Sequence, residues 1–154
     1  MWRSLKITMK NKITVSEILS PDSCAKCRGC CIFEESEEWE IPAEVRPPLP
    51  PTATSDGCNV CRHLGENGCQ LGENKPLACH MYPFRLMRLG SESDGKLAIA
   101  VSTFCKPVAK LSLLTLCEFV RTKSEDFKDL AKTHPEIIVE YDNNYVILEV
   151  IGAF

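Results

Sequence analysis

The sequence predicts an α+β fold. We expect one small domain stabilised by bound metal, with antiparallel strands in hairpins, a cysteine-rich irregular half and two C-terminal helices. Eight of the ten cysteines fall within residues 24–79, among turn-forming residues that make a poor core. Apolar residues have strand-like patterns around short polar turns in residues 85–103 and 136–151. Between these ranges, residues 107–122 carry apolar residues at helical spacing, and a second short helix is expected between Ser124 and Pro135.

A length of 154 residues fits one domain, 1–154. We assign residues 22–105 to a cysteine-cluster metal-binding region. Residues 106–154 are assigned to the helices and a C-terminal hairpin.

The N-terminal third carries only short signals. Apolar and polar residues alternate over residues 5–13, which predicts a strand. Thr14 and Glu17 have the spacing of a capping box, so a short helix is expected there, stopped by Pro21. The prolines of residues 42–56 predict a connection without regular structure.

The rest of the chain alternates turns with clearer elements. Residues 58–84 are rich in Gly, Asn and Pro and are expected to be turns. The run of residues 85–103 predicts two strands joined by the polar turn 90–95, with Cys105 following the second strand.

Two helices and a hairpin are expected after that. Pro107 suits the first turn of a helix that runs to about Thr122. Ser124 is placed to cap a second helix, which the next proline closes. The tail is predicted to be a hairpin of residues 136–141 and 145–151.

Composition and charge exclude several classes of protein. The net charge of −3 and the lack of a Lys- and Arg-rich face argue against nucleic-acid binding. No segment approaches the roughly 20 apolar residues of a membrane span, and the N-terminus lacks the pattern of a secretory signal. We therefore expect a cytoplasmic protein, where clustered thiols stay reduced and bind metals more often than each other.

The densest motif is CAKCRGCC at residues 24–31. Its C-x2-C-x2-C spacing lets three sulfurs converge on one centre from a tight loop, for which Gly29 supplies backbone freedom. Lys26 and Arg28 favour the thiolate form. Because adjacent residues usually point in different directions, Cys31 is expected to serve a second centre, as in bacterial ferredoxin motifs. A disulfide knot is the alternative interpretation.

Further motifs follow in a fixed order: Cys61-x2-Leu64, Gly68-Cys69, Lys75-Pro76-x2-Cys79 and Tyr82-Pro83-Phe84. With the CxxCxxCC motif, this arrangement resembles the CxxCxxCC cysteine-cluster family of the YkgJ type, described as a zinc- or iron-chelating domain. Flagellin lysine-N-methylases carry a similar cluster. The resemblance covers roughly residues 24–105 and implies metal or iron–sulfur binding in a prokaryotic cytoplasmic protein. Lys75 and His80 stand where the family usually has arginine.

The matching motif positions imply a set of cysteine ligands, and Cys105 is expected to complete it. Eight thiolates suit two four-coordinate centres. We favour iron–sulfur clusters over zinc, because the compact loop suits a cluster. The C-x2-C pair formed by Cys58, an additional candidate, is the best argument for zinc. The predicted ligands are Cys24, Cys27, Cys30, Cys31, Cys61, Cys69, Cys79 and Cys105.

Other residues of these types are expected to play structural roles. Cys117 lies in the apolar helix pattern and is expected to fill the core. The three histidines have the chemistry of metal ligands but are expected to be structural or exposed. They are His63, His80 and His134. Tyr82 and Phe84 are expected to shield the site from water.

The main functional hypothesis is a [4Fe-4S]-type protein that transfers electrons, or delivers a cluster, to a partner enzyme. The chain lacks nucleotide-binding glycine motifs and a nucleophile elbow. One alternative is a zinc-binding structural or adaptor protein. Another is an accessory or catalytic component of a methylase-like, protein-modifying enzyme, so whether the chain is an enzyme is left open. Each hypothesis implies a protein partner, either a redox protein or a modified one.

Overall fold

The computed structural model describes residue 13 and residues 15–27, 32–34, 52–53, 58–75, 77–91 and 93–153. Within these residues the fold is mixed α+β, as the sequence predicts. The strand expected at residues 5–13 lies outside the described residues apart from Ile13, whose side chain is buried in the core.

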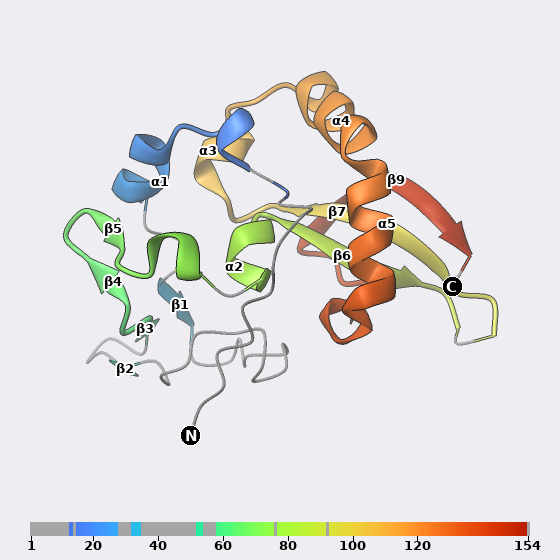
Figure 1. Ribbon diagram of the computed structural model, residues 1–154, viewed down its shortest axis with the longest axis horizontal. Coiled ribbons are helices and arrows are strands. Elements are labelled where there is room, and N and C mark those ends of the chain that lie inside the picture. The colour runs from blue at the N-terminus through green and yellow to red at the C-terminus, as the bar shows by residue number, and fades with distance from the viewer. Residues whose placement is uncertain are drawn as a thin grey trace.

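A four-stranded sheet forms the centre of the fold (Figure 1). Its order is β8-β6-β7-β9, and β6 and β7 form the predicted antiparallel hairpin. Every residue of β7 after Lys96 is buried, because this strand lies inside the sheet and is covered on both faces. The strands are β6 (Phe84–Leu89), β7 (Lys96–Ser102), β8 (Val139–Glu140) and β9 (Tyr145–Ala153).

The predicted C-terminal hairpin is wrong. Strand β8 pairs in parallel with β6, with Val139 opposite Met87. Strand β9 pairs antiparallel with β7, with Tyr145 opposite Ser102. The two strands therefore lie on opposite edges of one sheet. The backbone N–H and C=O groups of the buried strand β7 need hydrogen-bond partners on both sides, and β9 supplies these partners on the side away from β6.

The predicted helix from Pro107 to Thr122 is in fact two helices. The chain breaks between them because Ser112 starts a new helix, where its Oγ accepts a hydrogen bond from the backbone N–H of Thr115 at 3.1 Å. The helix expected after Thr122 is present, but Ser124 is its first residue and not its cap. The elements are α3 (Lys106–Ala109), α4 (Leu113–Thr122), α5 (Ser124–Thr133) and the 3₁₀ turn η5 (Pro135–Ile137).

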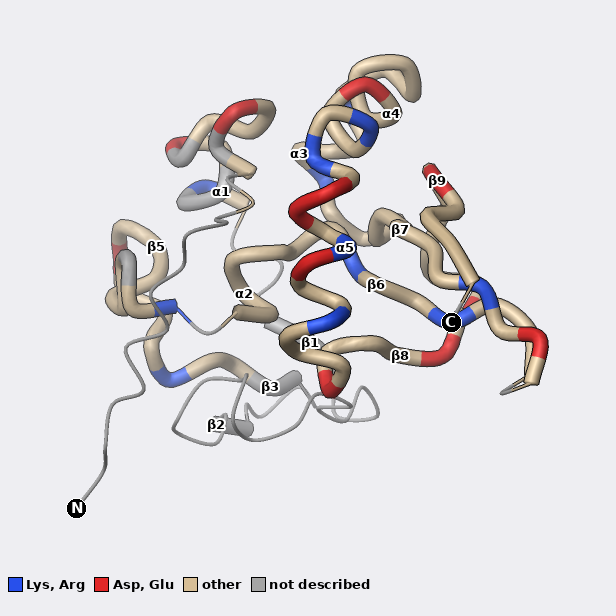
Figure 2. Tube along the Cα trace, turned by 45° about the vertical axis from the view of Figure 1, so that its right-hand side comes forward, with Lys and Arg blue, Asp and Glu red and all other residues tan. Residues whose placement is uncertain are grey.

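Helices α4 and α5 pack against the sheet through aromatic side chains (Figure 1). Phe84 of β6 is almost fully buried between Phe119 of α4 and Phe127 of α5. The outer surface of α5 carries charges of both signs (Figure 2), including an ion pair of 2.8 Å between Glu125 Oε1 and Lys128 Nζ. No helix within the described ranges has the length and apolar character needed to cross a membrane.

The first half of the described chain consists of short elements, as expected for residues 58–84. Two details differ from the prediction. Pro21 begins a helix where it was expected to end one, consistent with the preference of proline for the first helical turn. The two-residue strand β2 lies inside the proline-rich stretch. The elements are η1 (Val15–Glu17), α1 (Pro21–Cys27), β1 (Ile32–Glu34), β2 (Thr52–Ala53), β3 (Cys58–Val60), β4 (Leu64–Gly65), β5 (Gly68–Cys69), η4 (Gly72–Asn74) and α2 (Leu77–Met81).

Two small antiparallel sheets organise this half. Strand β3 lies between β1 and β2, with Ile32 and Thr52 both opposite Val60. Strands β4 and β5 form a tight hairpin. Figure 1 shows these strands with α1 and α2 on one side of the molecule, and α4 and α5 on the other.

Candidate metal centre

The structure describes the side chains of five predicted ligands. Cys27 is the last residue of α1, Cys61 directly follows β3, and Cys69 is the last residue of β5. Cys79 lies in α2, and Cys105 directly precedes α3. Each ligand therefore lies in or beside a short element on the side of the molecule opposite α4 and α5 (Figure 1).

One of these elements contacts two of the others. Helix α1 contacts both β5 and α3. The contacts bring together parts of the chain that are far apart in sequence, around Cys27, Cys69 and Cys105. Figures 1 and 2 both show α1 beside α3 and beside the β4–β5 hairpin.

The β4–β5 hairpin positions Cys69 relative to Cys61. The backbone N–H of Leu64 donates to the carbonyl of Cys61 at 3.1 Å, which closes the turn after β3. Leu64 then pairs with Cys69, so the chain returns toward its starting point. Gly68 supplies the φ of 102° that this reversal needs, a value that favours glycine.

The thiols differ in their exposure. Cys61 and Cys105 are buried, with 7% and 8% of their surface exposed. Cys27 and Cys69 are half-buried, and Cys79 is exposed. The predicted ligands therefore range in position from the protein interior to its surface.

The described side chains do not complete a metal site by themselves. Among them, no group of three or more His, Cys, Asp or Glu residues is arranged to hold a metal ion. The side chains of Cys24 and Cys58 and the whole of residues 30 and 31 lie outside the described residues. These are four of the nine predicted or candidate ligands.

One polar atom in this region is buried without a partner. Nε2 of His63 is shielded from solvent and has no hydrogen-bond partner among the described residues. His63 lies two residues after Cys61 and directly before β4. The sequence analysis expects His63 to be structural or exposed, and its side chain is half-buried.

The remaining Cys and His residues have other surroundings. Cys117 lies in α4 and is half-buried, whereas the sequence placed it in the core. His80 is a half-buried residue of α2. His134 follows α5, and its Nδ1 lies 2.9 Å from Oε1 of Glu136.

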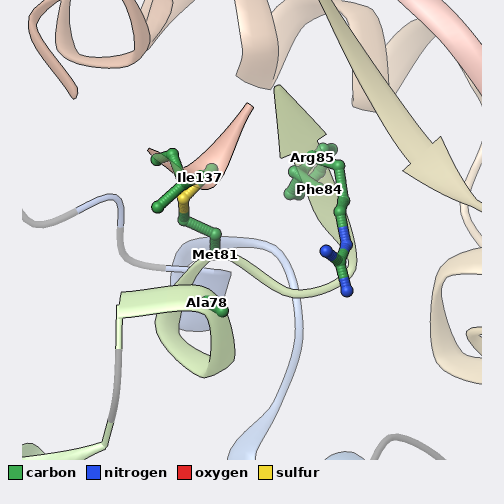
Figure 3. A pocket seen from close by; sticks show the side chains of 5 residues that line it. All are labelled: Ala78, Met81, Phe84, Arg85 and Ile137. Carbon is green, nitrogen blue, oxygen red and sulfur yellow. The ribbon is translucent and has the colours of Figure 1, made fainter. Parts of the chain in front are cut away.

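Two hollows of different size lie in the described part of the molecule. A cavity of about 10 Å³ lies where α2 and β6 meet η5. Figure 3 shows the side chain of Met81 directed toward Ile137 at this cavity. This volume holds about one water molecule. A larger hollow of about 390 Å³ lies over residues 65–70, includes Cys69 and is open to solvent. The predicted shielding residue Phe84 belongs to the core described above, and Tyr82 packs against that core.

Comparisons with known proteins gave no match: no family model, no curated protein and no solved structure is similar to this chain.

Proposed function

We propose that this protein binds metal through its clustered cysteines, as an iron–sulfur protein that transfers electrons, or delivers a cluster, to a partner enzyme. The contact of α1 with both β5 and α3 carries the proposal. These elements bear or adjoin Cys27, Cys69 and Cys105, which lie as far as 78 residues apart in the sequence. An iron–sulfur cluster, when bound, supplies one-electron redox chemistry.

The register of the three-stranded sheet also supports the proposal. Ile32 of β1 pairs with Val60 of β3, and their next neighbours in the sequence are Cys31 and Cys61. The described pairing thus sets the residue that follows the CxxCxxCC motif opposite the residue that precedes Cys61.

One feature of the backbone argues against a zinc ion held by the Cys58-x2-Cys61 pair. Both sulfurs of such a pair must reach one tetrahedral zinc, which is easiest when the chain turns between them. Residues 58–60 are extended instead. Positions 24 and 27 lie one turn apart in helix α1, where the sequence predicts a loop, and this spacing suits neighbouring ligands of a cluster or of a zinc ion alike.

The shape of the surface is compatible with a protein partner. Cys69 borders the open hollow over residues 65–70, and Cys79 is exposed. A centre near these thiols would lie at the protein surface, where a redox or cluster-accepting protein has access to it.

Anaerobic purification followed by an absorption spectrum and measurement of iron, zinc and acid-labile sulfide tests the proposal. We expect broad visible absorption, with iron and sulfide in comparable amounts. Zinc without sulfide would contradict the cluster and support the structural adaptor. Protein that contains neither metal, and takes up neither during anaerobic reconstitution, would contradict metal binding altogether.

A further inference from the structure

Strand β9 forms one outer edge of the four-stranded sheet. Within the described residues no strand pairs with its outer side. The strand is nine residues long, and Val146, Ile147 and Val150 in it are between 38% and 49% exposed. A long apolar edge strand is a template on which another chain can add a strand. The backbone and the composition of β9 therefore favour self-association.

The opposite edge of the sheet is protected by its shortness. Strand β8 has only two residues, Val139 and Glu140. Very short edge strands are one of the means by which proteins avoid pairing with other chains, because an added strand gains few hydrogen bonds. Strand β9 is too long for this protection and needs another.

One charged side chain of β9 is directed toward the core. Glu149 lies opposite the fully buried Ile99 of β7, so both side chains lie on the face of the sheet that packs against α4 and α5. The pKa of Lys128 in α5 is raised mainly by its hydrogen bond to Glu125, with a smaller contribution from the charge of Glu149. Oε2 of Glu149 is shielded from solvent and has no hydrogen-bond partner among the described residues. A carboxylate therefore lies at the margin of the apolar core, on the strand that ends the sheet.

The position of this carboxylate opposes the addition of a further strand. Glu149 is half-buried, so part of its side chain still contacts water. A strand added to β9 would cover that part, and burying an unpaired charge is costly. Residues 145–153 contain no Lys or Arg. The β9 strand of a second copy therefore supplies no cation to offset the cost.

Two irregularities in the pairing of β9 with β7 act in the same direction. The register shifts between Leu97 and Ala98 and again between Ile99 and Ala100. One residue of β9 is left without a partner in β7 at each shift, on either side of residues 149 and 150. Bulges bend and twist a strand, which disturbs the regular spacing that an added strand needs.

We propose that Glu149, together with these two bulges, prevents β9 from pairing with a second copy of this chain. Without the charge, the exposed side chains of Val146, Ile147 and Val150 would drive the β9 strands of two copies together about a two-fold axis. The result would be one continuous sheet through both molecules. This inference goes beyond the proposed function and does not depend on metal binding.

Variants that change the charge on either edge of the sheet test the proposal. Glu149→Val removes the carboxylate from β9, and Glu149/Val150→Val/Lys returns a charge to the same edge. Glu140→Val is the matched control, because it makes the same change on β8, where Glu140 pairs with Arg88. The full-length proteins are purified anaerobically in the same buffer. Analytical ultracentrifugation gives their oligomeric state over a range of concentrations, and circular dichroism shows whether each is folded.

We expect the unaltered protein and Glu140→Val to sediment as monomers over the whole range. Glu149→Val should form dimers or larger species at concentrations at least about 10-fold lower than the unaltered protein, because a penalty of about 1–3 kcal/mol or more is removed. The double variant should return to the monomer. Glu149→Gln keeps the shape of the side chain without its charge, and it should associate more strongly than the unaltered protein even if Glu149→Val fails to fold.

Several results would overturn the proposal. Folded Glu149→Val and Glu149→Gln proteins that both stay monomeric would show that the carboxylate does not block the edge. Equal self-association of Glu140→Val would attribute the effect to a general loss of charge. Self-association that persists in the double variant would place the contact away from β9. An unaltered protein that already dimerises, and that Val150→Lys converts to a monomer, would show that β9 is not protected.

Discussion

Phe84 of β6 stacks on Phe119 of α4, with ring centroids 5.2 Å apart and ring planes inclined by 30°. Phe127 of α5 meets the same ring nearly edge-on, at 6.3 Å and 67°. Stacked and edge-to-face pairs are the favoured geometries of aromatic rings. One side chain of the sheet thus anchors both covering helices.

Truncation of this anchor should be costly. Phe84 is 1% exposed, and Phe84→Ala leaves a cavity between sheet and helices, so the free energy of unfolding should fall by about 3–5 kcal/mol. Urea unfolding followed by circular dichroism measures the change. Phe104→Ala is the control: Phe104 is 59% exposed, and its loss should cost less than about 0.5 kcal/mol. Equal losses for the two variants would refute the anchoring role.

The cap of α4 can be tested with a serine pair. Ser112 Oγ accepts the backbone N–H of Thr115 at 3.1 Å, so Ser112→Ala should lower the free energy of unfolding by about 1 kcal/mol. Ser124 begins α5 without a side-chain cap on that helix, and Ser124→Ala should leave stability nearly unchanged. Chemical denaturation of both variants measures the free energies of unfolding. A decrease of the same size for Ser112→Ala and Ser124→Ala would contradict the role of Ser112 as the cap of α4.

Under the proposed function, the effect of a cysteine substitution on metal content should depend on where the cysteine lies. Cys69→Ser and Cys105→Ser should each reduce the bound iron and sulfide, because both residues adjoin elements that contact α1. Cys117→Ser should keep the full metal content, since Cys117 belongs to α4 and not to the candidate centre. Iron and sulfide are measured in each variant after anaerobic purification. Loss of metal only in Cys117→Ser would contradict the assignment of Cys69 and Cys105 as ligands.

Metal removal should loosen one half of the molecule more than the other. The elements of residues 58–75 are short and contribute few side chains to the hydrophobic core. Because the free energy of metal binding contributes to folding, we expect these elements to stay ordered only while metal is bound. Hydrogen exchange after chelation should speed up there, while the amides of β6 and β7 stay protected by the buried sheet. Uniform acceleration, or none, would argue against local stabilisation by metal.

One surface ion pair predicts a pH effect. The hydrogen bond from Lys128, and then its charge, hold the pKa of Glu125 below its ordinary value of 4.5. The stabilisation of the fold by this ion pair is therefore complete above the ordinary pKa of Glu125. It is lost as pH falls through the lowered pKa of the folded state. NMR titration of Glu125 should show the lowered pKa, and Lys128→Gln should return it to its ordinary range. An unchanged pKa in that variant would disprove the pairing.

Local signals in the sequence were sufficient for the β6–β7 hairpin and for the C-terminal ends of α4 and α5, but not for where these helices begin. They failed for residues 136–151, because the turn-like residues 142–144 suggest that the two flanking strands form a hairpin with each other. In the structure, β9 pairs with β7 instead. The clue was β7 itself. Residues 97–101 are apolar without alternation, which is typical of a strand inside a sheet, and such a strand needs two neighbours.

The cysteines of the candidate site could be named from the sequence, but their arrangement could not. Cys61 and Cys69 are implied as ligands by the resemblance of their motifs, and this stays a prediction, because the described side chains form no group that holds a metal ion. The burial of Nε2 of His63 without a hydrogen-bond partner among the described residues is a property of the tertiary structure, which spacing in the sequence does not show. The contact of α1 with α3 joins two segments that lie far apart in the sequence. The spacing of residues within each segment does not predict this contact.

The order of the large sheet also bears on how the chain is made. A ribosome completes β7 at residue 102, 43 residues before it begins β9 at residue 145, the strand that covers the second edge of β7. Until residues 145–153 emerge, an apolar strand with open backbone groups is available to any neighbouring nascent chain. Slow translation of this interval, or premature termination before it, would therefore favour aggregation, and chaperone demand should peak there.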